Sequence, residues 1–357
     1  MIDLPKDNSS RIVEQALSFR RPDRTPVYDL FWPEFVDKWR KRRQVQPETD
    51  IEDYYWLDLK VITPQEEFFP TNIGPIGFEN DRQLYNDGWG RIVSRKPDAS
   101  FSETIKTFIS TPGDLDNIEF DPPTLNMRYA DLLPEISHHR RKGRAIFLKI
   151  GGPFRRSTFI RGEENFLMDL AADPLFARAL AKKVGSHLMQ VGLESLRRTM
   201  PGNVGILIVD DMCNARTPMF SPALFEDIFL PIYEQIISEL KKAGARWVCF
   251  HCDGNVEPLL DLLIQAGVDG INPVEPNAGM HVAKLIEKYW GRLFFIGGIC
   301  NIKVLPGGDK DQIQGHVQNI IDAGRNGGLV VGMHSVGTDI SLESYETYRR
   351  IVVERGS

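Results

Sequence analysis

The amino-acid sequence predicts an α/β protein, namely a (β/α)8 TIM barrel with an N-terminal extension and a hairpin insertion. Eight short apolar runs bounded by turn residues alternate with amphipathic, helix-like segments, which is the pattern of buried parallel strands. Eight such units close a barrel in which right-handed crossovers bring the carboxyl ends of all strands to one face. We therefore interpret residues 1–357 as one barrel domain that contains the insertion at 72–107.

Each strand is predicted from a run rich in Val, Ile, Leu or Phe that meets turn-forming or charged residues at its end. The predicted strands are 26–30, 58–62, 145–150, 204–209, 247–250, 270–274, 293–296 and 329–332. Several helices between them begin at N-cap signals, namely Asp173, Ser221 and Ser341, and Pro follows two of these caps. Residues 87–93 have the pattern of a hairpin, which sets the insertion apart from the βα units.

Composition excludes several classes of function. The chain is 42% hydrophobic and 26% charged, as globular proteins are. Its formal net charge of −6 argues against a nucleic-acid partner, and we interpret the basic run 38–43 as a solvated helix face. No apolar run is long enough to span a membrane, and the first residues lack the apolar core of a signal peptide. Four scattered cysteines indicate a reduced, cytoplasmic protein.

The residues that follow the predicted strands are rich in His, Cys, Asp and Glu, the side chains that bind metals or move protons. His251, Cys252 and Asp253 follow one strand, and all three side chains are zinc ligands by type. Because side chains alternate along an extended backbone, Asp253 shares a side with His251, and Cys252 points the other way. We therefore favour Asp253 as the co-ligand of His251 and keep Cys252 as the alternative ligand.

Other strand ends add to this set. Glu275 and His334 each follow a strand, and His334 is the strongest partner for His251 because a nearby glycine allows close approach to a ligand. Asp210 and Asp211 either cap the next segment or line the barrel mouth, where they would be the catalytic carboxylates. Further members of the set are Asp29, Glu34 and Cys300. The histidines that we place at the surface are His138, His139, His187 and His316.

At these residues the chain resembles the uroporphyrinogen decarboxylase superfamily. Within it, the chain resembles the corrinoid-dependent zinc methyltransferases of the O-demethylase type more than the true decarboxylases. The order and spacing of the matching segments carry the resemblance over nearly the whole chain. These segments are 23–27, 162–168, 210–211, 221–222, 251–254, 278–280, 297–299, His334 and 340–343. The family fold is a (β/α)8 barrel, in agreement with the strand count.

The resemblance also implies a metal site. The zinc methyltransferases of this family carry His-x-Cys after the fifth strand, a glutamate one unit later and a cysteine after the last strand. Carried over by position, the implied ligands are His251, Asp253, Glu275 and His334. Asp253 and His334 stand where the family has cysteines, so this set is harder and poorer in thiolate. Such a set suits a Lewis acid that polarises an oxygen rather than one that activates a thiol.

An aromatic segment replaces a signature of the decarboxylase branch. Those enzymes resemble one another in an N-terminal Arg-Gln-Ala-Gly-Arg-Tyr sequence that binds a tetrapyrrole with several carboxylates. The corresponding segment here, 28–35, contains no arginine. We therefore interpret Phe31, Trp32 and Phe35 as substrate-binding residues for a small aromatic or apolar ligand, with the alternative that they belong to the core.

We expect a zinc-dependent methyltransferase that moves a methyl group from a small methylated compound, foremost a methoxylated aromatic, to cobalamin. The cofactors would be bound zinc and a cobalamin carried by a separate corrinoid protein that docks over the barrel mouth. One alternative is a metal-free decarboxylase in which His251 and His334 act as acid/base or anion-binding groups. Another is a non-catalytic binding protein for small aromatics. The methyl donor and the formation of a homodimer stay open.

Overall fold

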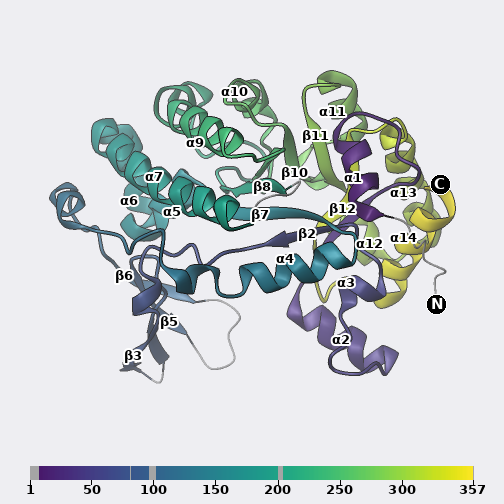
Figure 1. The fold of residues 1–357 in the computed structure, drawn as a ribbon, viewed down its shortest axis with the longest axis horizontal. Helices are drawn as coiled ribbons and strands as arrows, with labels where there is room; N and C mark the ends of the chain where they lie inside the picture. The colour runs from purple at the N-terminus through teal and green to yellow at the C-terminus, as the bar shows by residue number, and fades with distance from the viewer. Residues whose placement is uncertain (1–7, 81, 96–101, 200–203, 357) are drawn as a thin grey trace.

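Eight parallel strands form one nearly closed sheet in the computed structural model, which describes residues 8–80, 82–95, 102–199 and 204–356 (Figure 1). The strand order is β1-β12-β11-β10-β9-β8-β7-β2. The strands are β1 (Val27–Phe31), β2 (Leu59–Ile62), β7 (Ala145–Gly151), β8 (Val204–Val209), β9 (Val248–His251), β10 (Gly270–Val274), β11 (Phe294–Gly298) and β12 (Leu329–Val336). All eight coincide with the predicted runs, so the predicted (β/α)8 barrel is confirmed.

Helices surround this barrel on the outside, and their apolar faces pack on the outer residues of the strands (Figure 1). The main ones are α4 (Leu132–Arg141), α5 (Pro153–Arg161), α6 (Glu163–Ala172), α7 (Pro174–Thr199), α9 (Leu230–Lys242), α10 (Leu260–Gln265), α11 (Val282–Tyr289), α13 (Lys310–Gly324) and α14 (Leu342–Arg355). The predicted N-caps are confirmed, since the side chains of Asp173, Ser221 and Ser341 each accept a backbone hydrogen bond from the following turn. None of the helices in the described part of the chain has the length and apolar character needed to span a bilayer.

The N-terminal extension closes the amino end of the barrel. Helix α1 (Ser9–Leu17) packs across β2, β7, β11 and β12. Its buried residues Val13 and Leu17 join a cluster of inward-facing strand residues that includes Phe147 and Phe294. This cluster fills the barrel near the amino ends of the strands, so a site can form at their carboxyl ends.

The insertion after β2 lies within the predicted range of 72–107 but contains more strands than the one predicted hairpin. It forms a four-stranded antiparallel sheet of β3 (Gly74–Glu79), β4 (Arg82–Asn86), β5 (Arg91–Arg95) and β6 (Glu103–Thr107). The hairpin predicted at 87–93 corresponds to the β4–β5 turn and the first residues of β5. Trp89 in this turn packs against Phe68 and against Phe159 of α5, with ring centroids 5.2 and 5.8 Å apart. The sheet therefore attaches to the helix that follows β7.

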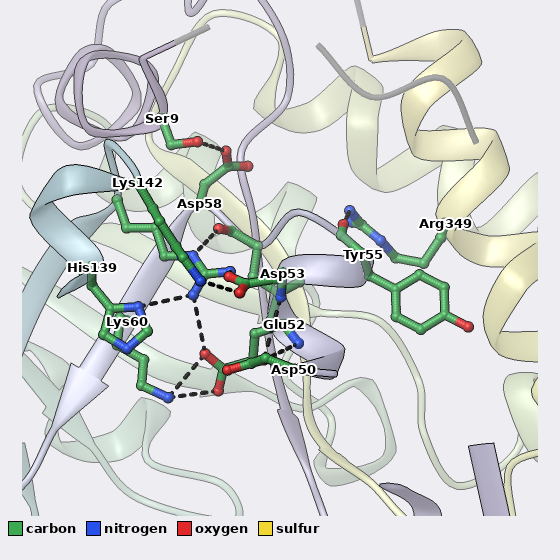
Figure 2. Close-up of polar contacts among 12 residues, drawn as sticks. Ser9, Asp50, Glu52, Asp53, Tyr55, Asp58, Lys60, His139, Lys142 and Arg349 are labelled. Atoms are coloured by element: carbon green, nitrogen blue, oxygen red, sulfur yellow. Dashed lines mark hydrogen bonds and ion pairs between the residues drawn. The ribbon is translucent and has the colours of Figure 1, made fainter. Parts of the chain in front are cut away.

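A buried carboxylate joins the two ends of the barrel sheet, between β1 and β2. Asp58, which is fully buried, accepts hydrogen bonds from the Val27 backbone (2.8 Å), from Arg24 (2.5 and 2.8 Å) and from Ser9 (2.6 Å). Its own backbone N–H donates to the Val27 carbonyl at 2.9 Å. Figure 2 shows Ser9 and Asp58 beside the ion pairs that link α3 (Ile51–Tyr54) to Lys60 of β2 and to Lys142, which follows α4. Asp58 thus ties α1, β1 and β2 together.

Replacing Asp58→Ala should lower the free energy of unfolding by about 3–5 kcal/mol, because the change removes the buried carboxylate that pairs with the mostly buried Arg24 guanidinium. Urea denaturation measures this. The matched control is Asp23→Ala, whose side chain is 56% exposed and paired with exposed Arg11. That change should cost no more than about 1 kcal/mol. Equal decreases in the free energy of unfolding for the two variants would show that Asp58 does not hold α1, β1 and β2 together.

Candidate metal centre

Three predicted metal ligands meet at the carboxyl end of the barrel. His251 ends β9, Asp253 lies two residues further along, and His334 faces them from β12. The Oδ1 atom of Asp253 lies 3.4 Å from Nε2 of His251 and 3.1 Å from Nε2 of His334. One ligand atom from each residue fits within 4.8 Å of the others, and each side chain is partly exposed. Residues 83 positions apart in the chain thus form one cluster.

Asn272 sets the orientation and tautomer of His251. Its side-chain oxygen lies 2.6 Å from Nδ1 of His251, and its amide nitrogen donates to the Ile296 carbonyl at 3.3 Å. The carbonyl acceptor fixes which end of the amide faces the histidine, so Nδ1 of His251 must be the donor. A neutral imidazole with hydrogen on Nδ1 has its lone pair on Nε2, the atom that faces Asp253. Asn272 was missed at the sequence level, although a polar residue in a buried strand is a signal.

The Asp253 carboxylate is held in an unusual environment. Its Oδ1 atom is buried and has no hydrogen-bond partner among the described residues, although it lies between two imidazoles. Burial raises the pKa of Asp253, but His251 and His334 outweigh burial and hold that pKa below its ordinary value. Burial lowers the pKa of His251, and the carboxylates of Asp253 and Asp211 reverse the shift and raise it. A buried oxygen without a donor, aimed at two ring nitrogens, is the arrangement that a bound cation satisfies.

The fourth predicted ligand, Glu275, lies outside the three-ligand cluster. Its Oε2 atom accepts a hydrogen bond from the Gly254 backbone at 2.7 Å. Gly254 has a φ of +87°, and a Cβ atom there would lie 2.3 Å from the Asn214 carbonyl oxygen. Glu275 therefore holds the tight turn that follows Asp253. Its coordination of a metal stays a prediction.

Cys252 points away from the cluster, as side-chain alternation predicts. Its side chain is fully buried, and its sulfur accepts a hydrogen bond from the Met212 backbone at 3.4 Å. Burial raises the pKa of the Cys252 thiol well above its ordinary value, which disfavours the thiolate that binds metals. Asp253, rather than Cys252, faces the two histidines.

The two predicted catalytic carboxylates differ in position. Asp210 is fully buried and accepts hydrogen bonds from the backbones of Phe154 and Arg155 and from the Tyr233 hydroxyl. It caps the first turn of α5, and burial raises its pKa to about 6. Asp211 is partly exposed at the mouth. Its Oδ1 atom accepts from the Asp253 backbone at 3.1 Å and lies 3.9 Å from Nε2 of His251.

The predicted aromatic residues are divided between core and surface. Phe35 is 1% exposed and belongs to the core, where it stacks on Phe31 with ring centroids 5.9 Å apart. Trp32 is 41% exposed at the end of β1, and its backbone donates to the Val336 carbonyl at 3.1 Å. Trp32 therefore lies near the strand end that carries His334, and contact with a substrate stays a prediction for all three aromatics.

The placement of some other histidines at the surface was wrong. His139 is 5% exposed and its Nδ1 lies 2.9 Å from Arg144, and His187 is 6% exposed between Phe68 and Phe120 (Figure 2 for His139). Burial lowers the pKa of His139 to about 4 and that of His187 to about 3, so both rings are neutral core residues. His316 is half-buried and accepts from the Cys300 backbone at 3.0 Å.

The residues present fit a divalent metal such as zinc. Two imidazole nitrogens and one carboxylate are a ligand set typical of catalytic zinc, which keeps a further position open for water or substrate. The side chains of His251, His334 and Asp253 are 15, 26 and 39% exposed, so a small ligand can reach the cluster from the mouth. The carboxylates of Asp211 and Glu275 nearby add negative charge that favours a cation.

The sequence profile of the family described as Uroporphyrinogen decarboxylase (URO-D) matches residues 99–354. The chain belongs to this family. Among curated proteins, no sequence gives a significant match. The family match covers every strand of the barrel except β1 and β2, and it includes all the residues of the metal cluster.

One solved structure shares the fold of this family member at low sequence identity, and two others match it at lower TM-scores. A methyltransferase from Methanosarcina mazei is 15% identical with a TM-score of 0.72, and the match covers 97% of this chain and 98% of that one. A B12-independent methionine synthase from Shewanella sp. W3-18-1 in complex with selenomethionine is 11% identical with a TM-score of 0.47, over 96 and 95% of the chains. A putative B12-independent methionine synthase from Listeria monocytogenes is 12% identical with a TM-score of 0.43, over 93 and 95%.

We predict that His251→Ala and His334→Ala each weaken zinc binding by more than about 100-fold, because loss of a ligand exceeds the effect of losing a supporting residue. Cys252→Ala should bind zinc as the unmodified protein does. Competition with a chelator measures the affinities, and elemental analysis measures occupancy and metal identity. Full zinc occupancy without both histidines would show that the site lies elsewhere, and iron as the bound metal would contradict zinc.

Asn272→Ala should weaken zinc binding by about 10- to 100-fold, because Nδ1 of His251 loses the acceptor that fixes its tautomer. The same competition assay measures this loss. Asn117→Ala is the control, since Asn117 is an exposed residue that bonds only to the Gly113 carbonyl among the described residues. An Asn272 variant with unchanged affinity would mean that the ring is held by its surroundings alone.

Proposed function

We propose that this chain is a zinc-dependent methyltransferase. It would move a methyl group from a small methylated compound, foremost a methoxylated aromatic, to the cobalamin of a separate corrinoid protein. The observation that carries the proposal is the group of His251, Asp253 and His334 at the barrel mouth, with the unpartnered Asp253 oxygen between two ring nitrogens. Family membership and a shared fold with a methyltransferase from Methanosarcina mazei support the proposal.

The chain's own residues would divide the work among holding, orienting and positioning. His251, Asp253 and His334 would hold the zinc ion, and Asn272 would keep Nε2 of His251 free to bind it. Glu275 holds the Gly254 turn and so fixes Asp253, and by its resemblance to the family's glutamate it would be a fourth ligand. When bound, zinc supplies Lewis-acid polarisation of the substrate oxygen, which makes that oxygen a better leaving group.

The ligand chemistry favours an oxygen-bound methyl group over a sulfur-bound one. Nitrogen and carboxylate ligands make a harder site than thiolates do, and hard sites prefer oxygen. The only described thiol next to the cluster, that of Cys252, is buried and turned away from it. An ether oxygen is therefore a better substrate atom for this site than a thioether sulfur.

Asp211 is the better placed of the two acidic residues for contact with a substrate. It lies at the mouth and close to His251, whereas Asp210 is buried and its oxygens are used by α5 and Tyr233. Asp211 would orient the substrate or hold a proton beside the oxygen that leaves. The corrinoid protein would dock over the mouth, because the reacting methyl group must be reached from outside the barrel.

Incubation with cob(I)alamin and a panel of methoxybenzoates should give methylcobalamin, observed by its absorption spectrum, and a phenolic product. Removal of zinc with a chelator should abolish the transfer, and added zinc should restore it. Asp211→Asn should lower the rate by about 100-fold or more if Asp211 moves a proton. Transfer at an undiminished rate without metal would contradict the proposal, and loss of carbon dioxide from a substrate would favour a decarboxylase.

A further inference from the structure

A lysine on the inner face of the barrel has no role in the metal cluster. The eight barrel strands, all of whose residues the structure describes, contain two lysines, Lys60 and Lys149. Lys60 lies on the outer face of β2 and binds Glu52 at 2.8 Å. Lys149 alternates with Ala145 and Phe147, which belong to the inward-facing cluster of the barrel, so it points inward above Phe147. Large apolar residues usually fill such positions.

Glu66 directs the Lys149 ammonium group toward the level of the metal cluster. The Oε1 atom of Glu66 lies 3.1 Å from Nζ of Lys149, and its Oε2 accepts from the Gly151 backbone. Gly151 pairs with Val209 of β8, and Val209 pairs with His251 of β9. The ammonium group therefore lies near the strand level at which His251 stands, and its side chain is 24% exposed.

The charges around Lys149 do not balance, so its ammonium group can pair with a further anion. Arg156 also binds Oε1 of Glu66, at 2.9 Å, so one buried carboxylate faces two cations. Burial and the charge of Glu66 both raise the pKa of the next carboxyl group, Glu67, which makes it the poorer counter-ion. An ammonium group has three donors, and Glu66 takes one of them.

Stability alone does not explain this lysine. A buried ion pair usually contributes no more than an apolar pair of similar volume, because desolvation offsets the attraction. Arg156 would neutralise Glu66 without help, and it is held in place by its stacking on Trp89, 4.1 Å from the ring centroid. A second cation, partly exposed and facing inward, is the arrangement expected at a site for an anionic ligand.

We infer that Lys149 binds a carboxylate group of the substrate while the metal cluster holds the methylated oxygen at the other end. Three neighbouring strands then present a cation, an apolar side chain and the metal cluster in sequence, from Lys149 through Val209 to His251. Gly151 and His251 are two strand spacings apart, about 10 Å along the wall. A single aromatic ring with a carboxylate and a methoxy group at opposite ends bridges such a span.

This inference rests on the proposed function and narrows its substrates to methoxylated aromatic acids. The direct test is binding of 4-methoxybenzoate and of its neutral counterpart 4-methoxybenzamide, measured by isothermal titration calorimetry on the full-length, zinc-supplemented protein. The unmodified protein should bind the benzoate roughly 10- to 100-fold more tightly, as expected for a charge-assisted hydrogen bond.

Lys149→Met should abolish this preference and leave binding of the amide unchanged, whereas Lys149→Arg should keep most of it. Lys60→Met, the matched control on the outer face, should behave as the unmodified protein does. Circular dichroism and thermal unfolding check that each variant folds. An unmodified protein without preference for the benzoate, or a Lys149→Met variant that keeps the preference, would overturn the inference.

The test separates this inference from the proposed function. His334→Ala should lose zinc and methyl transfer but keep the preference for the benzoate, because Lys149 and Glu66 remain in place. If the protein transfers no methyl group but binds the benzoate more tightly than the amide in a way that depends on Lys149, the anion site stands and the methyltransferase proposal is wrong. If Lys149→Met transfers methyl groups from the benzoate as fast as the unmodified protein does, the methyltransferase proposal stands and the anion site is wrong.

Discussion

The parallel register of β8, β9 and β10 is the constraint on which the candidate site depends. Val209 pairs with His251, and His251 pairs with Asn272, so the three residues stand side by side at the mouth of the barrel. That pairing brings the Asn272 amide to Nδ1 of His251 at 2.6 Å. A shift of one residue in either strand would turn His251 or Asn272 to the outer face.

The cluster has features of a site that is preorganised for a cation. His251 is fixed by Asn272, which is itself fixed by the Ile296 carbonyl, and Glu275 fixes the turn that carries Asp253. His251 and Asp253 thus each have a supporting contact. His334 has a weaker one, because the Ser335 hydroxyl lies 3.4 Å from its Nδ1 atom. Such support lowers the entropic cost of binding a metal and limits the geometry of the ligands. The Asp253 oxygen, buried and without a hydrogen-bond partner among the described residues, is the atom that a bound cation would satisfy.

Much of the fold could be predicted from the sequence, because buried parallel strands are apolar throughout and are bounded by turn residues. Alternation alone also placed Asp253 on the side of His251 and turned Cys252 away. The sheet of the insertion was predicted only as a hairpin, since β3 and β6 are short, polar or glycine-containing and have no clear period. The roles of Asn272, Glu275 and Asp210 depend on which strands and turns become neighbours. A polar residue in a buried strand draws attention to Asn272, but no local pattern identifies His251 as its partner. The burial of His139 and His187 was missed for the same reason.

Anomalous X-ray scattering at the zinc absorption edge, from crystals grown with zinc, would locate the metal on the chain directly. We expect one strong peak within coordination distance of His251, Asp253 and His334, with an open position toward the mouth. Such a map would also decide whether Glu275 joins the ligands. A peak at Cys252, or zinc bound elsewhere on the chain with no peak at the cluster, would show that these three residues are not the metal site.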